Sequence, residues 1–194
     1  MLIVRHRVNT RAQLEITPSN LGVEVDLRSR NDELILEHDP YKQGELFEEW
    51  LSGWNGQFLV LNTKEEGLEE RTIHTLNARK VEGYFFLDQS FPFMQKLIRS
   101  GNRRVASRAS DIESIQTPLN SGAEWCWLDS FSGNWNYLSE AIPELERKGI
   151  RTCLVSPELQ RIDSEVELVA LRSFLKSENL NIDAVCTKFP EAWG

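Results

Sequence analysis

Gly22-Val23-Glu24-Val25-Asp26-Leu27-Arg28 is the stretch of sequence that best indicates the fold. Its apolar residues alternate with two acidic ones, and a period of two is typical of a β-strand. In a strand the valines and the leucine point to one face, and the two carboxylates point to the other, ~6.5–7 Å apart along the chain. Ionisable groups at the end of a buried strand cost free energy unless something uses them, so the stretch indicates an enzyme.

Short apolar runs recur along the chain and alternate with segments of helical spacing. The predicted principal strands cover residues 2–5, 22–27, 58–62, 83–87, 103–107, 124–128, 150–155 and 182–186, with a short extended piece at 34–36. The predicted helices cover residues 45–51, 66–79, 91–98, 111–119, 135–147 and 164–176, with a brief one within 11–20.

This alternation predicts an α/β protein with a parallel sheet. Eight strand–helix units favour a closed (β/α)8 TIM barrel, formed by residues 1–194 as one compact domain, although the fold typically takes ~250 residues. A doubly wound open sheet is the alternative, but no glycine-rich dinucleotide turn follows the first strand. In a barrel, the carboxyl ends of the strands form the functional face.

The composition is that of an ordinary globular protein, with 40% hydrophobic and 27% charged residues. No segment approaches the ~20 apolar residues of a membrane span, and Leu2-Ile3-Val4 is followed at once by Arg5. We therefore expect no signal peptide, no stable membrane anchor and a cytoplasmic location. A net charge of −8 disfavours nucleic acid as a partner. Three cysteines without a C-x-x-C spacing are expected to be buried apolar residues. The sequence leaves the oligomeric state open.

Polar residues follow nearly every predicted strand. At these strand ends stand His6, Glu24, Asp26, Lys64, Asp88, Arg108, Asp129, Ser156, Glu158 and Lys188. Because parallel strands end at the same edge of a sheet, residues far apart in sequence are expected to meet there.

Glu24 and Asp26 repel each other, so either one of them takes up a proton or a cation lies between them. Oxygen ligands favour Mg²⁺ or Ca²⁺. Asn62 can add an amide oxygen to such a site. Lys64, two residues further along, points to the same face as Asn62 and can offset developing negative charge. The alternative for the acid pair is a solvated strand end with Arg28 as ion-pair partner.

His6 and His38 both follow apolar runs directly. Imidazole titrates near neutral pH, so two histidines beside a carboxylate pair suit a general acid and a general base. Arg7 and Arg28 carry guanidinium groups, which bind phosphate oxygens in bidentate fashion. The alternatives are structural histidines and surface ion pairs.

Four blocks occur in a recognisable order: His6-Arg7 with Asn9-Thr10, then Glu24-x-Asp26, then His38-Asp39, then a strand that ends in Lys64. Together they resemble the glycerophosphodiester phosphodiesterase family, which is similar in turn to the phosphatidylinositol-specific phospholipases C. The resemblance covers residues 5–64.

The resemblance implies a metal-dependent hydrolase of small glycerol- or sugar-linked phosphodiesters on a (β/α)8 barrel. It implies catalytic roles for His6, His38 and Lys64, metal binding by Glu24 and Asp26, and a phosphate contact by Arg7. Asn62 stands where the family usually has a glutamate ligand, Val8 replaces a glycine, and the helical insertion common after His38-Asp39 is missing.

Three other functions stay open at this point. One is a lyase that stops at a cyclic phosphate, and another is a degenerate barrel that only binds a phosphorylated ligand, which Asn62 favours. The third is a metal-assisted enzyme that acts on carbonyl substrates.

Overall fold

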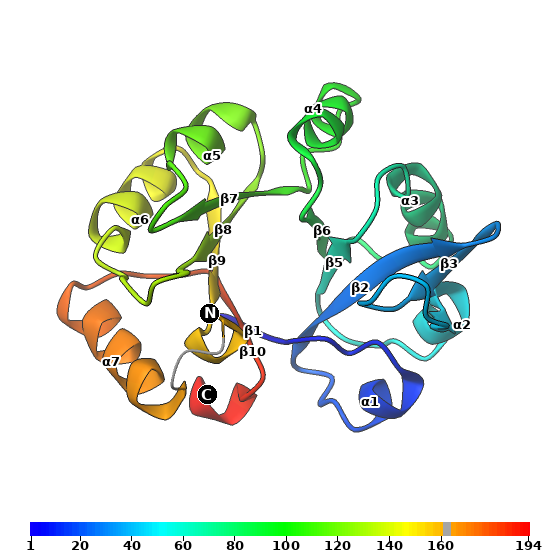
Figure 1. Ribbon diagram of the computed structural model, residues 1–194, viewed down its shortest axis with the longest axis horizontal. Helices are drawn as coiled ribbons and strands as arrows, with labels where there is room; N and C mark the ends of the chain where they lie inside the picture. Colours follow the sequence, from blue (N-terminus) through cyan, green and yellow to red (C-terminus); the bar gives the residue numbers. More distant parts are fainter. Residues whose placement is uncertain (161–163) are drawn as a thin grey trace. The chain divides into compact units, whose positions relative to one another are not determined.

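Figure 1 shows the computed structural model, which describes residues 1–160 and 164–194. The chain forms two compact units: Val4–Asn102 is one, and Met1–Ile3 together with Arg103–Gly194 is the other. The expectation that the whole chain is one domain stays a prediction.

The unit Val4–Asn102 is built around one long central strand. Its strands are β1 (Leu2–Arg5, of which Val4 and Arg5 belong to this unit), β2 (Gly22–Arg30), β3 (Glu33–Leu36), β4 (Glu45–Leu46), β5 (Leu59–Thr63) and β6 (Tyr84–Leu87). Its helices are α1 (Arg11–Glu15), α2 (Phe47–Ser52), α3 (Glu69–Ala78) and α4 (Phe91–Arg99). Strand β2 pairs in parallel with β1 and β5, and β5 pairs in parallel with β6.

The end of β2 forms a hairpin that the sequence pattern does not indicate. Beyond Leu27 the strand continues to Arg30 and pairs antiparallel with β3, which in turn pairs with β4. The turn passes through Asn31, whose φ of 53° is one that asparagine tolerates. The arm is polar and increasingly exposed, so it shows no apolar alternation by which its length could be recognised.

The segment between β1 and β2 contains one short helix. Thr10 caps α1 by accepting a hydrogen bond from the Gln13 amide, and the Gln13 side chain accepts one from the Thr10 amide in return. This capping box satisfies two amide groups that a helix start otherwise leaves unpaired. It fixes the point at which the chain turns away from the end of β1.

The other unit contains four parallel strands, β7 (Ala106–Ser110), β8 (Trp125–Asp129), β9 (Arg151–Val155) and β10 (Ala184–Thr187), paired in that order. Its helices are α5 (Gln116–Ser121), α6 (Leu138–Arg147), the 3-10 helix η1 (Pro157–Gln160), α7 (Ser164–Ser177) and the 3-10 helix η2 (Pro190–Ala192). Buried residues of the strands, α6 and α7 form its core, with Leu128, Leu145, Leu154 and Leu171 among them.

The predicted strand–helix alternation is confirmed, and most boundaries agree within a few residues. The strand predicted at 103–107 is Ala106–Ser110, and the helix predicted at 111–119 is Gln116–Ser121. The reason lies in Ser110, whose hydroxyl accepts hydrogen bonds from the amides of Ile112 and Glu113 and so holds a turn instead of a helix start.

The fold class is an α/β fold with a mostly parallel sheet, as predicted. Within the described part of the chain, β6 pairs with β5 and β7 with β8, and closure of a (β/α)8 barrel stays a prediction. All three cysteines are buried, as expected. In the described ranges no helix is long and apolar enough to cross a membrane; the cytoplasmic location stays a prediction.

Candidate active site

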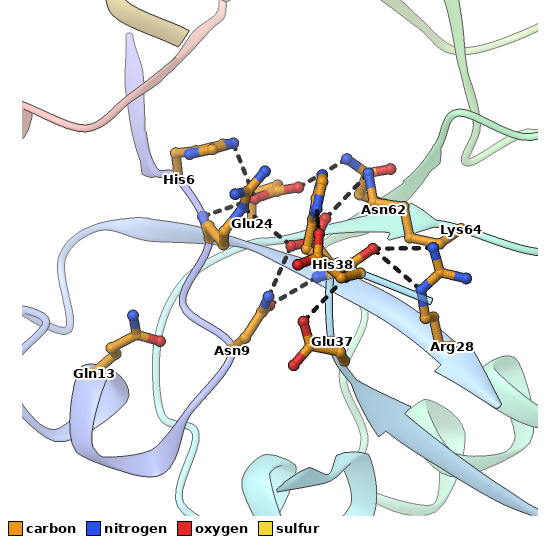
Figure 2. Close-up of polar contacts among 12 residues, drawn as sticks. His6, Asn9, Gln13, Glu24, Arg28, Glu37, His38, Asn62 and Lys64 are labelled. Carbon is orange, nitrogen blue, oxygen red and sulfur yellow. Dashed lines mark hydrogen bonds and ion pairs between the residues drawn. The ribbon is translucent and has the colours of Figure 1, made fainter. Parts of the chain in front are cut away.

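Two buried carboxylates lie at the centre of the candidate site (Figure 2). Glu24 is 1% exposed and Asp26 0%, both on β2. The β2–β5 register pairs Asp26 with Asn62, which brings the amide side chain of β5 to the acid pair. Unpaired carboxylates do not persist at this depth, so their partners define the site.

Asp26 is held by three side chains. The Asn9 amide donates to Oδ2 at 2.7 Å, the Arg7 Nε lies 3.3 Å from Oδ2, and the Lys64 Nζ lies 3.1 Å from Oδ1. The Asp26 backbone amide donates to Asn9 Oδ1 at 2.8 Å, which makes the contact with Asn9 reciprocal. Asn9 thereby fastens the segment after β1 to β2.

Glu24 accepts hydrogen bonds from β5 and from the segment that follows β1. Asn62 Nδ2 donates to Oε1 at 2.9 Å, and the Arg7 backbone amide donates to Oε2 at 2.7 Å. His6 Nε2 lies 3.8 Å from the same Oε2. Arg7 has a φ of 57°, in the left-handed region that non-glycine residues rarely adopt. Such strain gathers at functional sites.

Burial raises the pKa of Glu24 from 4.5 to about 7, and the negative charge of Asp26 adds to the rise. The hydrogen bond from Asn62, the charge of Lys64 and the Arg7 amide act in the opposite direction without cancelling it. Glu24 therefore takes up a proton at a higher pH than an exposed glutamate does.

This raised pKa predicts a pH dependence of stability. Between pH 4.5 and about 7 the folded chain holds a proton on Glu24 that the unfolded chain has lost, so the free energy of unfolding falls as pH rises through that window. Urea denaturation without divalent cations, at about pH 5 and about pH 8, should show a fall that Glu24→Gln reduces by roughly 1–3 kcal/mol. The exposed Glu70→Gln is the control. An unchanged pH dependence in Glu24→Gln would refute the raised pKa.

His38 lies just after β3, and its position depends on Arg28. The Arg28 guanidinium donates through Nε and Nη2 to the His38 carbonyl, at 3.1 and 3.0 Å. His38 Nδ1 lies 2.8 Å from Asp39 Oδ1, while Lys42 pairs with the other Asp39 oxygen at 2.5 Å. The hydrogen bond from Lys42, followed by that from His38, lowers the pKa of Asp39 to about 2.

Of the eight predicted site residues, Glu24, Asp26 and Arg28 lie on β2 and Asn62 lies on β5, and the other four follow β1, β3 or β5 within two residues. Contacts join His6, Arg7, Glu24, Asp26, Asn62 and Lys64 into one network. Arg28 and His38 form a second group, linked to the first because the Glu37 amide donates to the Asp26 carbonyl at 3.0 Å. The phosphate contact predicted for Arg28 stays a prediction; in the structure this side chain positions His38.

Three residues of the site had no predicted role. Asn9 holds Asp26, and Asp39 with Lys42 orients the His38 ring. The signals were present in the sequence, because Asn9 follows His6-Arg7 closely and Asp39 adjoins His38. Figure 2 shows Asn9, Glu24 and both histidines in the same close-up.

The side chains around the acid pair offer oxygen donors to a divalent cation. Asn62 is 8% exposed, and its Oδ1 is buried without a hydrogen-bond partner. Across residues 1–160 and 164–194, no group of three or more His, Cys, Asp or Glu side chains is placed to hold a metal ion. The two carboxylates and the unpartnered amide oxygen are nevertheless oxygen donors, which fit a hard cation whose other ligands come from water or substrate.

The strand ends of the other unit carry a separate polar cluster. Arg108 donates to Asp129 at 2.6 Å, and Gln160 donates to both of its oxygens at 2.9 Å. Glu158 accepts hydrogen bonds from Ser156, Thr187 and the Lys188 amide. These carboxylates are satisfied within their own unit, which is the arrangement expected of structural buried acids.

No protein-family model matches the sequence, and no curated protein matches it either. Solved structures do match. A glycerophosphodiester phosphodiesterase from Thermotoga maritima is 15% identical with a TM-score of 0.67, over 99% of this chain and 96% of that one. A putative glycerophosphoryl diester phosphodiesterase from Agrobacterium tumefaciens is 13% identical with a TM-score of 0.70, over 98% and 94%.

A third such structure, a glycerophosphoryl diester phosphodiesterase from Parabacteroides distasonis, is 14% identical with a TM-score of 0.69, over 98% of this chain and 84% of that one. At these identities the likeness shows the fold. It agrees with the α/β fold predicted from the strand–helix alternation.

Proposed function

We propose that this chain is a phosphodiester hydrolase that acts on a small glycerol- or sugar-linked phosphodiester. The observation that carries the proposal is the buried Glu24–Asp26 pair, with Arg7, Lys64 and His6 gathered around it at 3.1–3.8 Å. These residues lie on β2 or just after β1 and β5, in a chain with the fold of solved glycerophosphodiester phosphodiesterases.

Two cations of the chain bind the phosphate. The Arg7 side chain is 44% exposed and meets Asp26 through Nε, so its outer guanidinium nitrogens can donate to non-bridging oxygens. Lys64, anchored on the opposite oxygen of Asp26, offsets the charge that grows on these oxygens in the transition state.

The two histidines move the protons. Because Asp39 accepts from Nδ1 of His38, the other ring nitrogen can take the proton from the attacking water. The water oxygen forms a bond to phosphorus as the bond from phosphorus to the leaving oxygen breaks. His6 gives a proton to the departing alkoxide, so the products are a phosphomonoester and an alcohol.

Glu24, Asp26 and the amide oxygen of Asn62 would hold Mg²⁺ or Ca²⁺ at this site. When bound, such a cation supplies Lewis-acid catalysis by drawing electron density from phosphorus. Asn9 fixes the carboxylate of Asp26 through its hydrogen bond, and a carboxylate held in this way keeps its orientation for binding.

The test is a panel of small phosphodiesters, such as the glycerophosphodiesters of ethanolamine, glycerol and inositol, assayed with Mg²⁺, Ca²⁺ or EDTA. We expect at least one to be cleaved, with the rate reduced about 100-fold or more by EDTA and restored by added cation. A purified, folded chain that cleaves none of them would overturn the hydrolase proposal. Activity that survives thorough chelation would show that the reaction does not need a divalent cation.

A further inference from the structure

The charges at the acid pair already balance without a bound cation. Two buried carboxylates, Glu24 and Asp26, face two positive side chains, Lys64 at 3.1 Å and Arg7 at 3.3 Å from Asp26. A divalent cation alone would therefore leave a net excess of two positive charges in a largely buried site. Such an excess is unfavourable because the charges gather around two buried carboxylates, where the repulsion is screened less than in bulk water.

Asn62 adds a second obstacle to binding of the cation alone. It lies beside Asp26 in the strand register, and its Nδ2 donates to Glu24 Oε1 at 2.9 Å while its buried Oδ1 has no partner. To offer Oδ1 toward the acid pair, the amide has to turn and give up the hydrogen bond to Glu24. The neutral amide also adds no negative charge in compensation, whereas a carboxylate at this position would.

A phosphodiester supplies what the site lacks. It brings one negative charge and oxygen ligands, and it gives Arg7 and Lys64 a second anion besides Asp26. Cation and phosphodiester together leave one excess positive charge where the cation alone leaves two. Each ligand therefore lowers the free energy of binding the other, and such coupling is reciprocal.

We infer that Asn62 makes the site bind a divalent cation and a phosphodiester cooperatively, with weak affinity for the cation alone. The inference rests on the proposed function and adds to it the coupling between the two ligands. In the competing interpretation, Asn62 is only a structural donor to Glu24, and cation affinity does not depend on phosphate.

The test is a titration with Mn²⁺, followed by loss of the free-ion EPR signal, with and without saturating dimethyl phosphate. A blank without protein corrects for ion pairing in solution. For the wild-type chain we expect dimethyl phosphate to tighten Mn²⁺ binding about 10–100-fold, and Mn²⁺ to tighten dimethyl phosphate binding by the same factor.

The matched variant is Asn62→Asp, which adds a negative charge at nearly constant shape. It should bind Mn²⁺ alone about 10–100-fold more tightly than the wild type and lose most of the coupling. Asn77→Asp makes the same chemical change at an exposed position of α3 and should leave both affinities and the coupling unchanged.

Equal Mn²⁺ affinity with and without dimethyl phosphate in the wild type would overturn the inference, and so would a complete lack of Mn²⁺ binding. Full coupling in Asn62→Asp would overturn the role of Asn62. If Asn62→Asp does not fold without metal, the neutral Asn62→Gln is expected to keep the coupling, and its loss there would count against the inference. Because these readouts are binding constants, a failed hydrolysis assay and a failed coupling are distinguishable.

Discussion

Substitution of either His6 or His38 by glutamine is expected to lower kcat by about 10²–10⁴-fold, the usual contribution of a positioned general acid or base. Glutamine keeps a polar side chain but cannot exchange a proton near neutral pH. KM should change much less than kcat, because the phosphate is bound by other residues. Steady-state kinetics on the best substrate of the panel measures both.

His74→Gln is the matched control for these substitutions, because His74 is exposed on α3 in the same unit. It should keep the kinetics of the wild type. If His6→Gln or His38→Gln retained more than about a tenth of the wild-type kcat, the retained rate would exceed what loss of a proton-transfer group allows. That histidine would then be structural.

Replacement of Asp26 by asparagine should produce the largest loss of stability, about 3–5 kcal/mol in the free energy of unfolding. The substitution leaves Lys64 and Arg7 without their common counter-charge. It also replaces a carboxylate oxygen with an NH₂ group, which cannot accept the hydrogen bonds that Asp26 accepts. Phosphodiester turnover should be lost as well, since both phosphate-binding cations depend on this carboxylate for their positions.

Urea denaturation checks the stability prediction, with Asp32→Asn as control. Asp32 is exposed in the turn between β2 and β3, so its substitution should change the free energy of unfolding by less than about 0.5 kcal/mol. A loss below about 1 kcal/mol in Asp26→Asn would mean that water, not Asp26, compensates the two cations.

The sequence was sufficient to place Glu24 and Asp26 on one face of a strand, because their spacing of two is a local property of β-structure. The same spacing of two places Arg28 on the face of Glu24 and Asp26. Its contact with the His38 carbonyl depends on a hairpin whose polar arm, residues 28–30, carries no apolar alternation. A contact of this kind depends on chain reversal and cannot be obtained from spacing alone.

The contacts of Asn62 and Asn9 with the acid pair likewise depend on long-range structure, which the local sequence pattern does not reveal. The pairing of Asp26 with Asn62 depends on how β2 aligns with β5, and register is specified by packing of whole strands. The reciprocal bonds between Asn9 and Asp26 follow a left-handed turn at Arg7. Arginine gives no local signal for that conformation, whereas a glycine there would have.

The most direct test of the central claim is phosphorus NMR of the reaction with the best substrate in ¹⁸O-labelled water. We predict that a phosphomonoester forms directly and carries the label on phosphorus, because water attacks phosphorus and the alcohol leaves unlabelled. A cyclic phosphate as the final product would show that the chain is a lyase and not a hydrolase. An unchanged phosphodiester signal with the folded wild-type chain and divalent cation present would contradict phosphodiester cleavage itself.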